Sequence, residues 1–179
     1  MSQVSTTTSG PRRRVAMTWV VWITAVIAYG FAVMQRTSLG VMGLTAAAHF
    51  NAPASVVATF MVLQLAVYAV LQIPAGITVD RLGSRVVITA GSIVMTVGQV
   101  VMALTGSVGG AVLARVLVGC GDAFIFGAAI RLVPAWFPPK QTPLVTQLTG
   151  LLGQFGQVVS AVGLVAMVNS SGWRSTYLL

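Results

Sequence analysis

The feature that most constrains this chain is a series of five apolar runs, each long enough to cross a lipid bilayer. A helix needs about 20 predominantly apolar residues to cross the hydrocarbon core. Runs of this length lie at about residues 18–39, 55–79, 86–104, 111–133 and 144–168. In lipid a spanning segment has to satisfy its backbone polar groups internally, as a helix does. We therefore predict an all-α polytopic membrane protein: five transmembrane helices plus the start of a sixth at residues 175–179.

Charge supports the same class and argues against a nucleic-acid partner. Only 7% of the residues are charged, whereas soluble domains carry roughly 25%. The net charge of +8 would suggest nucleic acid in a soluble protein. Here the basic residues lie mainly in gaps between apolar runs, which is typical of membrane topology signals. We expect a lipid bilayer, and no nucleic acid, as a partner.

The basic residues also predict an orientation. If the N-terminus is cytoplasmic, one side carries Arg12, Arg13, Arg14, Arg81, Arg85, Arg131 and Lys140. The other side carries only Arg174 and Arg36. The positive-inside rule then favours a cytoplasmic N-terminus, in a plasma (bacterial inner) membrane. Residues 1–16 are predicted to be a disordered cytoplasmic tail, because the Ser/Thr-rich start lacks a core-forming pattern.

A distinctive loop, GITVDRLGSR, connects the second and third spans at residues 76–85. Gly76 and Gly83 suit positions where the chain turns or another helix passes closely. Asp80 is expected at the entry to the next helix, where it could cap free amides. Arg81 and Arg85 would anchor the loop at the anionic inner leaflet. The alternative is an ordinary loop that follows the positive-inside rule.

This loop resembles the signature loop of the major facilitator superfamily, G-x-x-x-D-[RK]-x-G-[RK]-[RK], with Ser84 where a basic residue is usual. Residues 115–121, RVLVGCG, are similar to the R-x-x-x-G-x-G pattern of the fourth helix in that family. The resemblance implies that residues 17–179 form an incomplete six-helix, N-terminal half-domain and that a C-terminal half-domain is missing. In complete members two such bundles rock about a midplane site, and the loop would stabilise one state.

Two charged residues of the fourth span are candidates for the transport path. Asp122 is the only carboxylate in any predicted span, and a charge at that depth should face a partner or a cavity. Arg115 precedes it by seven residues, so both face one side, roughly 10 Å apart. Arg36, in the outer part of the first span, is a possible second partner. We hypothesise a proton-binding or ion-pairing site at Asp122. The alternatives are a structural interhelical hydrogen bond at Asp122 and arginines that snorkel to the headgroups.

The fifth span combines small residues with glutamines. Gly153, Gly156 and Gly163 are spaced to form a seam that another helix could approach closely. Gln154 is a candidate to bind polar groups of a substrate, although it could equally bond to a neighbouring helix. We expect helix packing for the glycines.

The sequence predicts transport rather than catalysis. It has no converging nucleophile and base, paired carboxylates, metal ligands or phosphate-binding loop, so we expect no enzyme, cofactor or metal. The resemblance implies secondary active transport of a small solute by alternating access, coupled to protons or another ion, within a complete twelve-helix transporter. The arginines favour an anionic substrate. The alternative is a truncated, non-transporting membrane protein or an assembly subunit.

Overall fold

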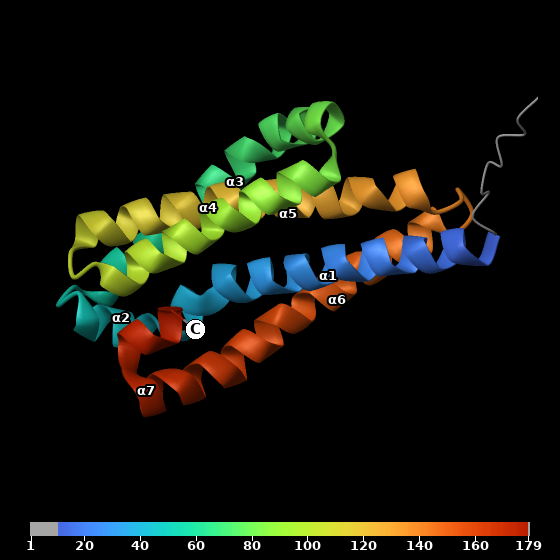
Figure 1. Ribbon diagram of the computed structural model, residues 1–179. Helices are drawn as coiled ribbons and strands as arrows, with labels where there is room; N and C mark the ends of the chain where they lie inside the picture. The colour runs from blue at the N-terminus through green and yellow to red at the C-terminus, as the bar shows by residue number, and fades with distance from the viewer. Residues whose placement is uncertain (1–10, 179) are drawn as a thin grey trace, which may run out of the picture.

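The computed structural model describes residues 11–178, which are predominantly helical and contain no strand (Figure 1). The helices are α1 (Pro11–Val41), α2 (Gly43–His49), α3 (Ala54–Leu82), α4 (Ser84–Leu104), α5 (Val108–Trp136), α6 (Thr142–Val159) and α7 (Val165–Leu178), with a π-helical turn, η1 (Ser160–Leu164), joining the last two. Five candidate membrane spans cover residues 15–41, 54–82, 84–104, 108–136 and 142–170. The predicted all-α polytopic fold is confirmed.

The first helix begins earlier than the sequence predicts. α1 starts at Pro11, so residues 11–16 of the predicted tail are helical, while residues 1–10 lie outside the described part of the chain. Proline is favoured in a first helical turn, because its missing N–H would have no intrahelical acceptor there. The arginines that follow are good helix formers. The predicted boundary after residue 16 is therefore too late for the start of the helix.

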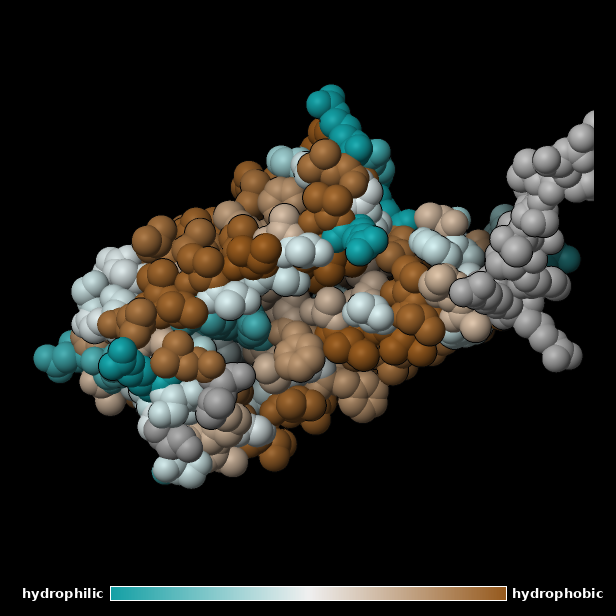
Figure 2. Space-filling model, viewed as in Figure 1, coloured by the Kyte–Doolittle hydropathy of each residue, from teal (hydrophilic) through white to brown (hydrophobic). Residues whose placement is uncertain are grey.

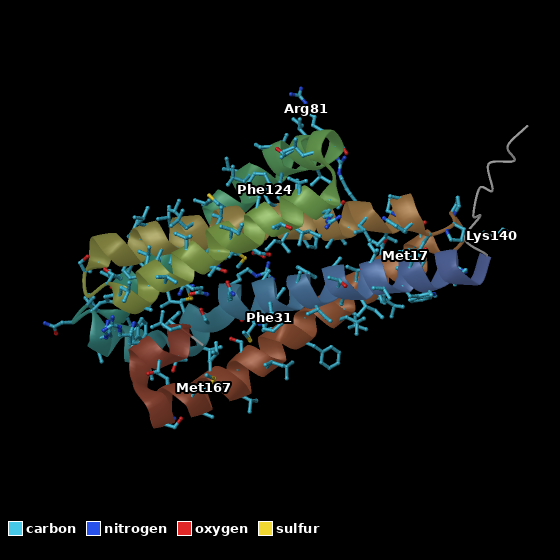
Figure 3. All side chains as sticks on the ribbon, in the orientation of Figure 1. Met17, Phe31, Arg81, Phe124, Lys140 and Met167 are labelled. Atoms are coloured by element: carbon cyan, nitrogen blue, oxygen red, sulfur yellow. The ribbon has the colours of Figure 1, made fainter. Side chains whose placement is uncertain are left out.

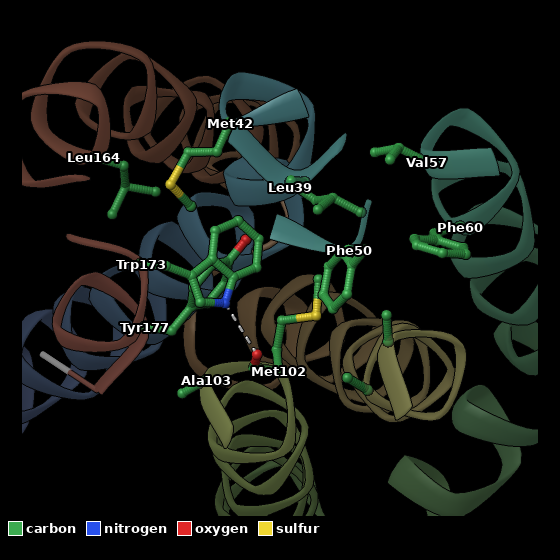
Figure 4. Close-up of a cluster of buried hydrophobic side chains, with 13 residues drawn as sticks. Leu39, Met42, Phe50, Val57, Phe60, Met102, Ala103, Leu164, Trp173 and Tyr177 are labelled. Carbon is green, nitrogen blue, oxygen red and sulfur yellow. Dashed lines mark hydrogen bonds between the residues drawn. The ribbon is translucent and has the colours of Figure 1, made fainter. Parts of the chain in front are cut away.

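The chain turns sharply at Gly172, which has a φ of +77°. Trp173 and Tyr177 follow directly and return into a cluster of buried side chains (Figure 4). The Trp173 indole Nε1 donates a hydrogen bond to the carbonyl oxygen of Met102, at 3.3 Å (Figure 4). The new helical direction thus begins at Trp173, two residues before the predicted start of a sixth helix.

α5 is the central helix of the bundle and packs against α1, α3, α4 and α6. Its contact with α4 is a backbone contact, made possible by glycines. A Cβ on Gly98 would lie 3.0 Å from the carbonyl oxygen of Ala114, and one on Gly91 would lie 3.0 Å from the carbonyl oxygen of Gly121. In Figure 1, α3 and α6 lie at the two edges of the bundle. The central position of α5 places both of its mid-helix charged residues, Arg115 and Asp122, inside the protein.

The outer surface is apolar over most of the face shown in Figure 2. Many large hydrophobic side chains are exposed along the spans, including Val70, Ile73 and Val162, each more than 70% exposed. Such a surface suits lipid or an apolar protein partner rather than water. The molecule is thus a multi-pass membrane protein.

Candidate functional site

The candidate site is built around Asp122, which lies at the centre of the 29-residue helix α5. At 1.5 Å per residue, it is about 21 Å from each end of the helix. Its side chain is fully buried, and its Oδ2 accepts a hydrogen bond from Arg36 Nη1 of α1 at 3.2 Å. A charge-assisted contact of this kind is stronger than a neutral hydrogen bond. Arg36 was the possible second partner predicted for Asp122 from the sequence, and the structure places it against that carboxylate.

Arg36 lies between the buried carboxylate and an open pocket. Its side chain is 18% exposed, and its guanidinium carbon lies 5.7 Å from the centre of the Tyr68 ring, a cation–π geometry. The pocket has a volume of about 260 Å³. It is lined by Arg36, Thr37, Gly40, Val41, Met61, Gln64, Leu65 and Gln157, from α1, α3 and α6. The ion pair is thus buried on the Asp122 side and reachable on the Arg36 side.

The other oxygen of Asp122 is free to accept a further proton or donor. Oδ1 is buried and has no hydrogen-bond partner within residues 11–178. Buried polar atoms in native structures nearly always have a partner. An unpaired carboxylate oxygen beside an ion pair is therefore a place where a proton, water or ligand donor can bind.

Arg115 is fully buried, so the alternative that it snorkels to the outer headgroups is wrong. Its Nη2 donates to the Tyr177 hydroxyl at 3.2 Å, and its Nη1 donates to Gln64 Oε1 at 3.4 Å. The same Gln64 side chain donates from Nε2 to the backbone carbonyl of Arg36 at 3.3 Å. Gln64, which sequence analysis did not single out, therefore connects the two arginines. A single glutamine in an apolar run gives no sequence signal of such a role.

The structure does not bring Gln154 into this cluster: its side chain is exposed on α6 and does not line the pocket beside Arg36. The residue of α6 that lines the pocket beside Arg36 is Gln157. The two glutamines are three positions apart, so they lie on the same general side of α6. Sequence spacing could identify that side but not which glutamine meets α1.

The loop residues occupy the end of the bundle where α3, α4 and α5 meet. Asp80 lies inside α3 and pairs with Arg131 of α5, with both side chains about half exposed. Gly83, with a φ of +81°, ends α3, and no side chain caps α4, so the predicted capping role of Asp80 is wrong. A Cβ on Gly76 would lie 3.3 Å from Arg131 Nη2, so this glycine makes room for the arginine.

The remaining basic residues of the loop, Arg81 and Arg85, are exposed. Figure 3 shows Arg81 extending away from the bundle. Neither arginine makes an ion pair among the described residues. They are thus placed where they could meet lipid headgroups or another protein.

Two of the three predicted packing glycines lie at the contact between α6 and α1. A Cβ on Gly153 would overlap the Tyr29 ring, and one on Gly156 would overlap the carbonyl of Gly30. Gly163 makes no such close contact among the described residues: the nearest atom to an added Cβ is Val159 Cγ1, at 3.9 Å. It lines a separate pocket instead.

A hydrogen bond that sequence analysis did not anticipate joins the same two helices. The indole Nε1 of Trp22 in α1 donates to Thr149 Oγ1 of α6 at 2.9 Å, and both side chains are buried. Thr149 is needed at this position because the buried indole N–H of Trp22 would otherwise lack an acceptor, which is costly. It adds a polar anchor to the glycine contact between α1 and α6.

Comparisons with known proteins agree with this architecture. A family model described as "Major Facilitator Superfamily" matches residues 18–179. The "Probable L-galactonate transporter" of Escherichia coli (strain K12) is 24% identical over 159 residues, which cover 89% of this chain and 34% of that protein. The "Probable sulfoacetate transporter SauU" of Cupriavidus necator is 26% identical over 112 residues, covering 63% and 26%. The "Hexuronate transporter" of Escherichia coli (strain K12) is 25% identical over 114 residues, covering 64% and 26%.

The chain spans about a third or less of the length of these relatives, 34%, 26% and 26%. All three are named as transporters, which agrees with the expectation that the chain is not an enzyme.

Proposed function

Because the chain belongs to the Major Facilitator Superfamily, we propose that it is the N-terminal part of a transporter that moves a small anionic solute by alternating access. In this proposal residues 17–179 belong to a six-helix bundle, and a C-terminal half-domain completes a twelve-helix protein. Substrate sites in such folds lie near the bilayer midplane between the two halves. The depth of Asp122 on α5 agrees with that position.

The observation that carries the proposal is the buried Arg36–Asp122 ion pair beside an open pocket. While the pair is closed, the positive charge of Arg36 is neutralised. Protonation of Asp122 removes the carboxylate charge and leaves Arg36 able to bind an anion. A proton and an anionic substrate would then enter the site together, which is proton-coupled symport.

Two further facts favour an anionic substrate. L-galactonate, sulfoacetate and hexuronates, the compounds in the relatives' names, are all organic anions. A guanidinium group matches the geometry of a carboxylate or sulfonate with two parallel hydrogen bonds. Arg36 presents such a group to the pocket.

The signature loop would act as a conformational element at the cytoplasmic face of a bacterial inner membrane, with the N-terminus also cytoplasmic. The Asp80–Arg131 pair is about half exposed. Exposed pairs contribute little to stability, about 0–1 kcal/mol. Such a pair can be made and broken during a conformational cycle without a large barrier, and Arg81 and Arg85 are free to contact the second half.

Reconstitution tests the proposal directly. The full-length protein that contains this chain is placed in proteoliposomes, and uptake of labelled L-galactonate, galacturonate and sulfoacetate is measured with and without an inward proton gradient. We expect uptake of at least one of these anions, stimulated by the gradient. In an Asp122→Asn variant, the gradient should no longer stimulate uptake. Failure of the wild-type protein to take up any of the three would count against an anion transporter of this kind. An Asp122→Asn variant with undiminished pH dependence would remove Asp122 from the coupling step.

A further inference from the structure

We propose that Gln64 is the positioning residue of this site: it joins the two arginines and leaves the charge of Arg115 without a carboxylate partner, available to an anion. The inference rests on the proposed function and adds a determinant of substrate charge. Gln64 lies on α3, at the level where α1 and α5 both approach it. Its side chain is only 2% exposed.

The geometry of Gln64 is fixed from two sides. Its amide nitrogen donates to the Arg36 carbonyl and its amide oxygen accepts from Arg115, so both ends of the side chain are occupied. The backbone is fixed as well, because Gly119 of α5 packs directly onto it. A Cβ on Gly119 would lie 2.6 Å from the Gln64 carbonyl oxygen. The amide group therefore has one position, in which it holds Arg115 and the backbone of Arg36 at a set separation.

The acidic residues of the chain are already committed to other arginines. The sequence contains two aspartates and no glutamate. Asp122 pairs with Arg36, and Asp80 pairs with Arg131. Arg115 is left with two neutral acceptors, Gln64 Oε1 and the Tyr177 hydroxyl, and within residues 11–178 its buried Nε has no acceptor.

A buried guanidinium without a counter-ion is unfavourable, so its persistence points to an anion that binds there during function. Arg36, Arg115 and Asp122 together carry one net positive charge when all three are ionised and two when Asp122 is protonated. In both states an anionic substrate would offset the excess positive charge. A glutamate at position 64 would have nearly the same shape as glutamine and would remove one unit of this charge. The neutral amide therefore keeps the site suited to an organic anion.

The chain offers a closely matched control in Gln99. This glutamine of α4 is also buried, 7% exposed, and its Nε2 also donates to a backbone carbonyl of α1, that of Gln35, at 3.3 Å. Its amide oxygen has no arginine partner within the described residues. Gln64→Glu and Gln99→Glu thus make the same chemical change to the same kind of hydrogen bond. Only the first places a carboxylate against a guanidinium.

The experiment compares Gln64→Glu, Gln64→Leu and Gln99→Glu in the full-length protein. Uptake into proteoliposomes is measured with whichever of labelled L-galactonate, galacturonate and sulfoacetate the wild-type protein transports. We expect Gln64→Glu to raise KM by about ten-fold or more, because the new carboxylate competes with the substrate for Arg115. Gln99→Glu should leave KM within about two-fold of wild type, as expected for a change at an independent site. A wild-type KM in Gln64→Glu would overturn the inference.

Thermal unfolding of the same variants in detergent tests the charge argument without any substrate. If Arg115 lacks a counter-ion, Gln64→Glu supplies one and should unfold at a higher temperature than Gln64→Leu. If another group already neutralises Arg115, the added carboxylate is in excess and Gln64→Glu should unfold at the lower temperature, which would overturn the inference. A wild-type protein that transports none of the three anions would contradict the proposed function, and this comparison would still decide the role of Gln64.

Discussion

Replacing Arg36 by glutamine should destabilise the protein more than replacing Asp122 by asparagine, although both changes break the same ion pair. Asp122 is fully buried, so Arg36→Gln leaves an ionised carboxylate with neither oxygen paired to a cation. Removing one partner of a buried pair costs about 3–5 kcal/mol. Asp122→Asn leaves Arg36 18% exposed and still against the Tyr68 ring. We expect a cost of about 1–2 kcal/mol for that variant.

The double variant measures the interaction energy between Arg36 and Asp122. With glutamine at 36 and asparagine at 122, two neutral amides face each other and no charge is stranded. Its destabilisation should fall short of the sum of the single variants by about 2–3 kcal/mol, the coupling energy expected of residues in direct contact. The measurement is equilibrium unfolding of the purified protein in mixed micelles of a mild detergent and SDS, followed by circular dichroism.

The pH dependence provides a second readout with a definite sign. Lowering the pH protonates the stranded carboxylate in Arg36→Gln and removes the unpaired charge, so the deficit of this variant relative to wild type should shrink as the pH falls. Additive costs in the double variant would refute the reasoning, because they would mean that Arg36 and Asp122 do not interact in the folded protein.

Other contacts make predictions of the same kind. Gly156→Ala should cost about 1–3 kcal/mol, because the new methyl group overlaps the Gly30 carbonyl; Gly163→Ala, which meets no other helix, should stay within about 1 kcal/mol of wild type in the same unfolding assay. Thr149→Val should cost about 1–3 kcal/mol, since it leaves the buried indole N–H of Trp22 without an acceptor, and a cost near zero would mean that this hydrogen bond is replaced. Asp80→Asn should change the free energy of unfolding by less than about 1 kcal/mol, as expected of an exposed pair; a loss of several kcal/mol would show that the pair holds the fold together.

The transmembrane helices were predictable from the sequence because the bilayer imposes a length and a polarity on every span. The short helix α2 and the exact end of α3 were harder to predict from the sequence. α2 is only seven residues long and has no side-chain cap, so its sequence carries little signal of a helix. Asp80 was expected as a cap because it lies close to the turn. The left-handed conformation of Gly83 instead ends α3 three residues later, which leaves Asp80 facing Arg131 of α5.

The three charged residues of the candidate site could be singled out from the sequence, but their contacts could not. The cost of a charge in lipid was enough to single out Arg115 and Asp122. Helical spacing placed them roughly 10 Å apart, and among the described residues no ion pair joins them. The choice of Arg36 as the partner of Asp122, and the link through Gln64, depend on how three helices pack, which is set by close contacts such as Gly119 against α3. Such contacts are not encoded in the periodicity of any single span.

Arg36 and Asp122 are 86 positions apart in the sequence, so they are synthesised at different times. Ribosomes add about 5–20 residues per second, so Arg36 is made roughly 4–17 seconds before Asp122. A charged residue at the centre of a helix opposes its insertion by about 2.5–3.5 kcal/mol on biological scales. When α5 reaches the membrane, the guanidinium that offsets this cost is already present on the helix that was made first. The order of the helices along the chain therefore lets the less insertable segment enter beside its counter-charge.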